Sequence, residues 1–175
     1  FTGGYAYAGS RVQGSADFFW AKVQDGIAFF QLSPILFTYN NVREYKSSGV
    51  AAQVAVDLPY GFAPSVSYTY NKREDDQGRE IGGFPKHSGF VKLLWSNPRL
   101  GLRANLRGQL NGKVPVAVGA TSYQPAYDVW YAQASKRITA RGIYSFNLYA
   151  QVSNLFDQKD VFNRDLQGNP RTNEV

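Results

Sequence analysis

The sequence predicts an all-β chain of about eight antiparallel strands, on three observations. Aromatic residues make up 15% of the 175 residues, and 17 residues are glycine. Aromatic side chains favour strands, and glycine favours turns. Apolar and polar residues alternate with a period of two along most segments, as on strands with one apolar face. Short and long connections alternate between these segments, which is typical of up-and-down hairpins.

The first half of the chain predicts four strands. They cover Phe1–Gly9, Ser15 to about Phe30, Phe37–Leu58 and a fourth segment that alternates from Ser65 to Asn71. Short turns are expected at 10–14 and 59–64. We expect a loop over Leu32–Ile35, because Pro34 cannot donate a ladder hydrogen bond.

The second half predicts four more strands, after a long polar connection over Lys72–Lys86. They cover Gly89–Ser96, Leu100–Leu110, Ala126–Arg137 and 143–152, with short turns at 97–99 and 139–142 and a long connection over Asn111–Pro125. The sixth strand alternates most cleanly, with Leu102, Ala104 and Leu106 on one face. The seventh places Tyr127, Val129 and Tyr131 on one side.

Alternation of this kind fits a membrane barrel or a soluble barrel, which differ in the face that the apolar residues cover. No apolar run approaches the 18 residues of a membrane-spanning helix, but a spanning strand needs only about ten. Arg103, Asn105 and Arg107 on one face suit a hydrated interior. Aromatic rings also gather near strand ends, as girdles do at membrane interfaces: Tyr68, Tyr70, Trp95, Tyr127, Trp130, Tyr131 and Tyr144. We therefore expect the apolar faces to contact lipid, with a soluble ligand-binding β-barrel as an alternative.

Composition excludes several functions. The net charge is +6, but the basic residues are scattered, so we expect no nucleic-acid partner. No cysteine is present, which excludes disulfides and thiolate metal sites. His87, the only histidine, is expected at the rim of a strand. Glu74, Asp75, Asp76 and Glu80 fit no calcium loop and are expected to be solvated. No catalytic constellation, metal site or cofactor site is found, so no enzyme is expected.

Four residues at the end of the last strand, Asn154, Leu155, Phe156 and Asp157, resemble the V-x-N-L-F-D signature in the penultimate strand of TonB-dependent outer-membrane receptors. Three further stretches are similar to motifs of the same family: Asn41-Val42 with Ser48-Gly49-Val50, Asp25-Gly26-Ile27, and Phe84-Pro85-Lys86-His87-Ser88. Ala51 or Ala52 stands where the family usually has an acidic residue.

The resemblance implies an antiparallel up-and-down transmembrane barrel of roughly 22 strands with an amino-terminal plug. Residues 1–175 would form a partial barrel domain of about eight strands, without the plug, the early strands and the last strand. The family's work would be TonB-coupled uptake of a scarce nutrient, such as a ferric siderophore, across the bacterial outer membrane. A small complete eight-stranded barrel with a structural or adhesion role is an alternative, because eight strands can also close a barrel.

Candidate ligand-binding residues are of two kinds. Arg103 and Arg107 lie about 13 Å apart along one face of a strand. They are expected either to attract an anionic ligand or to pair with carboxylates of the plug or of neighbouring strands. Phe84 and Tyr123 lie in the outer loops, where each can contact a ligand or pack within its own loop.

Overall fold

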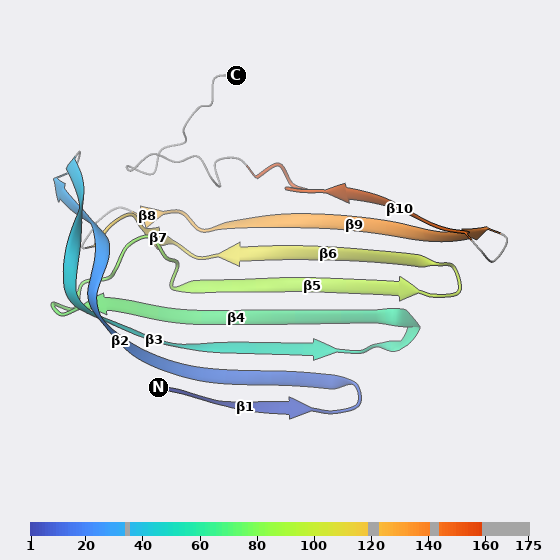
Figure 1. Ribbon diagram of the computed structural model, residues 1–175, viewed down its shortest axis with the longest axis horizontal. Helices are drawn as coiled ribbons and strands as arrows, with labels where there is room; N and C mark the ends of the chain where they lie inside the picture. Colours follow the sequence, from blue (N-terminus) through green and yellow to red (C-terminus); the bar gives the residue numbers. More distant parts are fainter. Residues whose placement is uncertain (34–35, 119–122, 141–143, 159–175) are drawn as a thin grey trace, which may run out of the picture.

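The computed structural model describes residues 1–33, 36–118, 123–140 and 144–158, which form a curved antiparallel sheet with long loops at one rim (Figure 1). Eight strands follow the order β1-β2-β3-β4-β5-β6-β9-β10. Their bounds are β1 Thr2–Ala8, β2 Val12–Ser33, β3 Leu36–Val56, β4 Phe62–Asp75, β5 His87–Asn97, β6 Leu102–Asn111, β9 Tyr127–Ala140 and β10 Tyr144–Val152. The predicted all-β class and the up-and-down order are confirmed.

Two smaller elements lie in the connections. The strands β7 (Val114–Pro115) and β8 (Tyr123–Gln124) form a second sheet, and a 3-10 helix, η1, covers Pro59–Gly61. Within the described part of the chain, no helix is long and apolar enough to cross a membrane.

Short turns lie at one rim of the sheet and long connections at the other (Figure 1). The turn from β3 to β4 passes through η1, where Gly61 has φ +79. A Cβ atom at Gly61 would lie 2.0 Å from the carbonyl oxygen of Ser96, so only glycine fits there. The long connections, between β4 and β5 and between β6 and β9, lie at the opposite rim, which we call the loop rim.

Several predicted boundaries were wrong. The first two residues of the expected loop over Leu32–Ile35 belong to β2, and Ser33 pairs with Leu36 at the start of β3; positions 34 and 35 lie outside the described residues. The missing donor of a proline affects only its own position, so it does not prevent pairing at Ser33. Residues 72–75, expected in a polar connection, belong to β4 and pair with β3, because polar side chains do not prevent backbone bonding.

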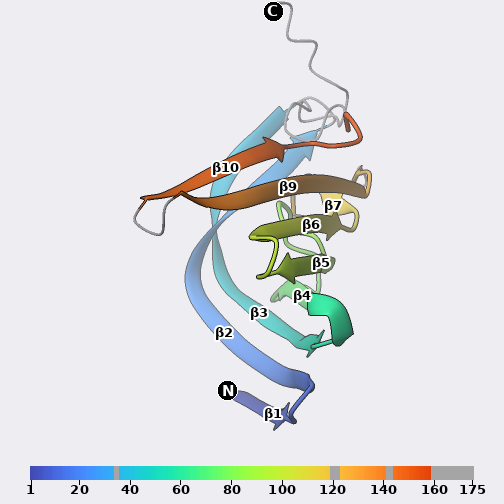
Figure 2. The same cartoon turned by 90° about the vertical axis from the view of Figure 1, so that its right-hand side faces the viewer.

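Other strand ends moved by a few residues. β6 begins at Leu102 and not at Leu100, because Gly101 has φ +65 in the preceding turn. The strand β9 continues to Ala140, past the turn expected from Thr139. Figure 2 shows that β2 and β3 curve strongly along their length.

Strand register divides the sheet into a polar and an apolar face. Side chains of β6 at odd positions share a face with Lys92 of β5 and Gln133 of β9. A cavity of about 750 Å³ on this face touches both Ala6 of β1 and Arg107 of β6. Tyr45 of β3 lies on the same face and packs against Ile81 and Val118 of the two long connections, so these connections fold over the polar face, which we call the lumen face.

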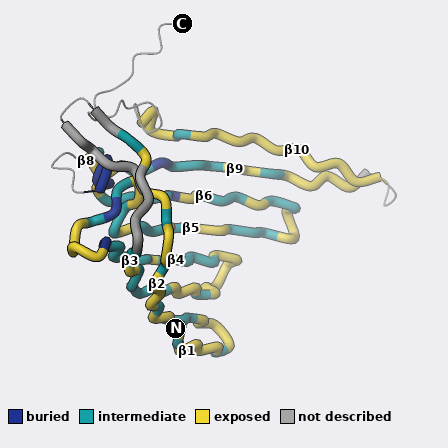
Figure 3. The backbone as a smooth tube through the Cα atoms, turned by 60° about the vertical axis from the view of Figure 1, so that its left-hand side comes forward, coloured by how far each residue is buried: buried dark blue, intermediate teal, exposed yellow. Residues whose placement is uncertain are grey.

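The opposite face is apolar, and within the described residues no protein layer covers it. Phe146 and Leu148 are 57% and 61% exposed. The buried hydrophobic residues of the described chain are Ile81, Val114, Val116, Ala117, Val118 and Val129, and they gather at the loop rim (Figure 3). This exposure agrees with the predicted orientation, in which the apolar face is the outer, lipid-contacting face and the polar face lines the lumen.

Aromatic side chains edge the apolar face at two levels. Phe62 and Trp95 lie together near the short turns, with ring centroids 6.3 Å apart. Near the loop rim, the hydroxyl of Tyr68 lies 2.6 Å from Nδ1 of His87, whose ring centroid is 5.2 Å from that of Tyr70. Eight residue steps separate Phe62 from Tyr70, or about 27 Å, which matches an apolar band about 25 Å tall.

Two members of the predicted girdle were assigned to the wrong face. Tyr127 pairs with Asn111, and Tyr131 pairs with Arg107, so both lie on the lumen face with Val129 between them. The mistake arose because a tyrosine suits either face: its ring is apolar, and its hydroxyl can bind water.

Candidate ligand-binding rim

The two long connections pack together at the loop rim and form what we call the outer-loop cluster. It consists of residues 73–86, from the end of β4 to the start of β5, and residues 114–118 with Tyr123, from the connection between β6 and β9. The cluster contains most of the buried hydrophobic residues of the described chain. It is therefore a folded platform at the outer end of the barrel wall.

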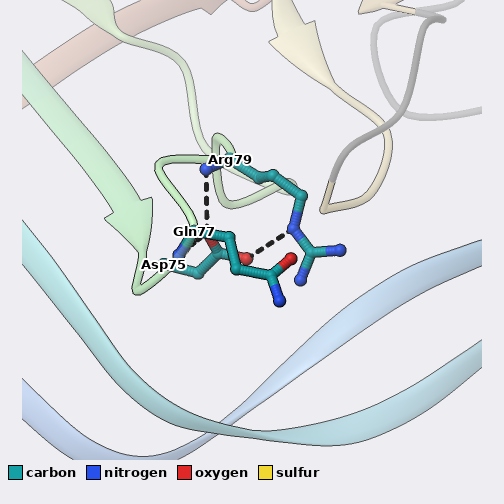
Figure 4. Close-up of polar contacts among 3 residues, drawn as sticks. All are labelled: Asp75, Gln77 and Arg79. Atoms are coloured by element: carbon teal, nitrogen blue, oxygen red, sulfur yellow. Dashed lines mark hydrogen bonds and ion pairs between the residues drawn. The ribbon is translucent and has the colours of Figure 1, made fainter.

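A buried carboxylate holds the connection between β4 and β5 in its folded shape through hydrogen bonds (Figure 4). The Asp75 side chain is 0% exposed, and its Oδ1 accepts hydrogen bonds from the backbone N–H groups of Gln77 and Arg79 at 3.0 and 2.8 Å. Its Oδ2 accepts one from Nε of Arg79 at 2.7 Å. An aspartate that bonds the backbone two residues ahead forms an Asx turn, which explains why the chain reverses here.

The connection between β6 and β9 packs against the connection between β4 and β5. Gly83 donates its backbone N–H to the carbonyl oxygen of Pro115 at 2.8 Å. A Cβ atom at Gly82 would lie 2.4 Å from Cα of Ala117, so this close approach requires glycine. Ile81 and Val118 form a small buried core with the ring of Tyr45 from β3. Both loops are thus fixed to each other and to the wall.

Exposed aromatic rings lie on this platform. Phe84 is 51% exposed, and the guanidinium carbon of Arg73 lies 3.9 Å from its ring centroid, which is a cation–π contact. Nε of Arg73 is buried and makes no hydrogen bond within the described structure. Tyr123, on β8, is 47% exposed. A platform with fixed, exposed rings can bind the apolar or planar part of a ligand.

Charged side chains of the cluster are mostly paired. Nζ of Lys86 lies 2.9 Å from Glu80, and Nζ of Lys72 lies 2.7 Å from Glu74. The hydrogen bond to Glu80 is the main cause that raises the pKa of Lys86 above 10.5, its ordinary value. Across the described residues, no three His, Asp or Glu side chains are grouped closely enough to bind a metal ion.

The four predicted ligand-binding residues do not come together. Phe84 and Tyr123 belong to the outer-loop cluster, as their loop positions suggested. Arg107 lies on the lumen face, lines the large cavity and contacts the ring of Phe90. Arg103 lies on the same face but opposite Ser96, close to the short turns, and so is remote from the cluster.

The signature residues form a turn that returns to β9. Asn154 has φ 52, and its side chain donates to the carbonyl oxygen of Gln158 and accepts from its backbone N–H. Asp157 donates its backbone N–H to the carbonyl oxygen of Asn154 at 2.9 Å. Leu155 donates to the carbonyl oxygen of Trp130 at 2.8 Å, and Phe156 packs on the Trp130 ring. These contacts hold the four residues in the turn after β10, against Trp130.

The central role of Asp75 was missed in the sequence. Its neighbours in sequence are charged, and composition alone suggested a solvated loop. The sequence does contain one local signal, an aspartate followed by Gln77 and Gly78, which favours an Asx turn. Its burial could not be predicted from this local signal, because the residues around it in the sequence are charged or polar.

Comparison with known proteins gives a consistent picture. A family model described as "TonB dependent receptor-like, beta-barrel" matches residues 1–155. No curated protein sequence matches the chain.

Solved structures match the fold. The ferric enterobactin receptor of Pseudomonas aeruginosa superposes with a TM-score of 0.70 at 17% identity, over 92% of this chain and 25% of that chain. The siderophore receptor PirA of Acinetobacter baumannii gives 0.68 at 15% identity, over 92% and 27%. The copper transporter OprC gives 0.69 at 18% identity, over 90% and 25%. The chain thus spans about a quarter of the length of these structures.

Proposed function

Because the chain belongs to the TonB-dependent receptor β-barrel family of the bacterial outer membrane, we propose that it forms one part of the barrel wall of a nutrient-uptake receptor. In this proposal residues 1–175 are a partial barrel domain, and a plug, earlier strands and a final strand belong to the same protein. The transported nutrient is a scarce one such as a ferric siderophore. Transport is coupled to TonB, and the protein performs binding and gating rather than catalysis.

The observation that carries the proposal is the arrangement of the loop rim above a polar lumen. The outer-loop cluster holds Phe84 and Tyr123 exposed on a platform fixed by buried residues. Below it, the lumen face offers hydrated polar side chains along the strands. A ligand bound at the rim therefore has a polar path toward the short-turn side.

The open edges of the sheet favour a partial barrel over the small complete barrel. Among the described residues, β1 pairs only with β2, and β10 only with β9. A closed eight-stranded barrel would pair β1 with β10. Unpaired strand edges are not tolerated in lipid, so further strands are expected on both sides.

The proposal is tested with the complete gene that encodes this segment. A strain that lacks the gene, and that has no other receptor for the chelate supplied, should lose growth on that ferric chelate as its sole iron source. The complete gene should restore growth, and removal of TonB should abolish it again. The proposal would be overturned if strains with and without the gene grew equally well on every member of a panel of iron, copper and other metal chelates.

The role of the rim is tested separately. Replacing Phe84 and Tyr123 together by alanine should weaken binding of the transported chelate by about tenfold, because each exposed ring removed costs part of the apolar contact. Leu100→Ala is the matched control, since Leu100 is 58% exposed in a short turn at the opposite rim. Equal weakening by the control variant would argue against ligand capture at the outer-loop cluster.

A further inference from the structure

We infer that the outer end of the lipid-facing wall carries a phosphate site for an anionic lipid of the outer leaflet, formed by Lys22, Lys46 and Lys72 on three neighbouring strands. The inference goes beyond the proposed function, because it concerns the outer surface of the wall and not the path of the nutrient. It assigns a partner, a phosphorylated lipid, to residues that the outer-loop cluster does not use.

Strand register places the three lysines on the apolar face. Lys22 of β2 is directly opposite Lys46 of β3. Lys72 of β4 is opposite Ser48, which lies two residues further along β3 on the same face. Tyr45 points to the lumen face and packs against the two long connections. Because successive side chains of a strand point to opposite faces, Lys46 points away from the lumen.

The lysines begin where the apolar band ends, near the loop rim. Along β2, the exposed rings of Phe18 and Trp20 come directly before Lys22 on this face, and along β4 Tyr70 comes before Lys72. Phe18 and Lys22 are about 13 Å apart along the strand, or about 10 Å along the membrane normal at the usual strand tilt. Lysine side chains are long enough to reach back toward the interface. The ammonium groups therefore lie at the level of the lipid headgroups.

Lys46 is the surplus cation of this group. Nζ of Lys22 lies 2.6 Å from a carboxylate oxygen of Glu44, and Nζ of Lys72 lies 2.7 Å from one of Glu74. Glu74 is opposite Lys46 in the ladder, but its carboxylate is bound to Lys72. Among the described residues, no carboxylate forms an ion pair with Lys46, whose side chain is exposed. Three lysines and two glutamates leave one positive charge, which favours an anionic partner.

The pairing of Lys22 with Lys46 fits a phosphate group. Directly opposite side chains begin about 5 Å apart, and like charges in that position destabilise a sheet. A phosphate oxygen bridging the two ammonium groups would form charge-assisted hydrogen bonds to both and remove their repulsion. Lys136 differs, because it lies on the apolar face near the short turns between Leu102 and Leu148, with no second cation of the described strands beside it on that face.

The apolar band below the lysines favours a lipid over a soluble anion. A groove of about 440 Å³ lies in this band, lined in part by Val66, Tyr68 and His87. The His87 ring packs against Tyr70, with ring centroids 5.2 Å apart, and Lys72 lies two residues beyond Tyr70. A lipid offers both an acyl chain for the groove and a phosphate for the lysines, whereas a soluble anion would use the lysines alone.

Lipid binding by the complete receptor in neutral detergent tests the inference. Native mass spectrometry measures the affinity for a diphosphorylated, multiply acylated glycolipid and for the same glycolipid without its phosphates. The phosphorylated form should bind about tenfold more tightly. Lys46→Gln, which breaks no ion pair of the described residues, should weaken that binding by about fivefold and leave the dephosphorylated form unaffected. Lys46→Arg should retain binding, because it keeps the charge. Lys136→Gln is the matched control and should leave both affinities unchanged.

Equal affinity for the two glycolipids, or equal weakening by Lys46→Gln and Lys136→Gln, would overturn the inference. Inorganic phosphate is the probe for the alternative occupant. If it binds the receptor alone, if Lys46→Gln abolishes that binding, and if the two glycolipids bind equally, the lysines form a site for a soluble anion and the inference is wrong. A receptor that still restores growth on the ferric chelate would in each case leave the proposed function standing, so the two failures are distinguishable.

Discussion

Phe156 packs edge-to-face on Trp130, with ring centroids 6.1 Å apart and ring planes at 73°. The contact joins the turn after β10 to the start of β9, on the apolar side of the sheet. Trp130 in turn lies over Gly108 of β6, where a Cβ atom would meet its ring at 2.8 Å. The signature motif therefore has a physical role: it folds the chain back onto β9 and, through Trp130, is linked to β6.

We expect substitution of Asn154 to destabilise this turn in a graded way. Asn154→Gly keeps the positive φ but loses the two side-chain hydrogen bonds to Gln158, at a cost of about 1 kcal/mol. Asn154→Ala also imposes left-handed strain and should cost about 2 kcal/mol. Urea unfolding of the complete barrel in detergent measures both. The same midpoint for glycine and alanine would show that backbone conformation is unimportant here.

Loss of the Asp75 carboxylate should open the first long connection. In Asp75→Asn the amide N–H₂ would face Nε of Arg79, so a buried donor loses its acceptor at a cost of about 1–3 kcal/mol. Limited trypsin digestion of the folded receptor should then cut faster after Arg79. Asp76→Asn is the matched control, because Asp76 is exposed next to Asp75 in sequence. Equal rates of cutting in the two variants would show that the Asp75 carboxylate does not hold this connection in place.

Adjacent residues of β6 should differ sharply in their tolerance of charge. Leu106 lies on the apolar face beside Leu93 and Ala132, two residues further from the short turns than the position opposite Trp95, whereas Asn105 faces the lumen and donates to Gln133 at 3.0 Å. Arginine on the lipid face costs about 2–4 kcal/mol near the bilayer midplane and less near the interfaces. Leu106→Arg should therefore lower the free energy of unfolding in lipid vesicles by about 2 kcal/mol or more. Asn105→Arg should change it by about 1 kcal/mol or less, through the lost hydrogen bond. The reverse order would invert the assignment of the two faces.

The contribution of Lys86 to the Lys86–Glu80 pair should persist through neutral pH and be lost at high pH. Glu80 raises the pKa of Lys86 above 10.5 in the folded protein. A group whose folded pKa is raised stabilises the fold fully below its unfolded pKa and loses that contribution as pH rises through the folded value. Titration of the Lys86 side chain by NMR should show the raised pKa, and Glu80→Gln should lower it. An unchanged Lys86 titration in that variant would exclude Glu80 as the cause.

The sequence by itself determined the strands, the faces and the family. Successive side chains of a strand point to opposite faces, so a short stretch of sequence is enough to assign them. The alternation alone places Leu102, Ala104 and Leu106 on the face opposite to Arg103 and Arg107. The signature from Asn154 to Asp157 is also local, because its turn depends on neighbouring residues. Where a side chain suits both faces, as Tyr127 and Tyr131 do, the local pattern indicated the wrong face.

Only the tertiary structure decided how the loops and the lumen charges are arranged. Gly82 of the connection between β4 and β5 packs against Ala117 of the connection between β6 and β9, and these residues lie far apart in the sequence. The opposition of Lys92 and Arg107 likewise depends on the register between β5 and β6. Register is fixed by turn geometry and by pairing across the whole sheet, so neither relationship is contained in any single stretch of sequence.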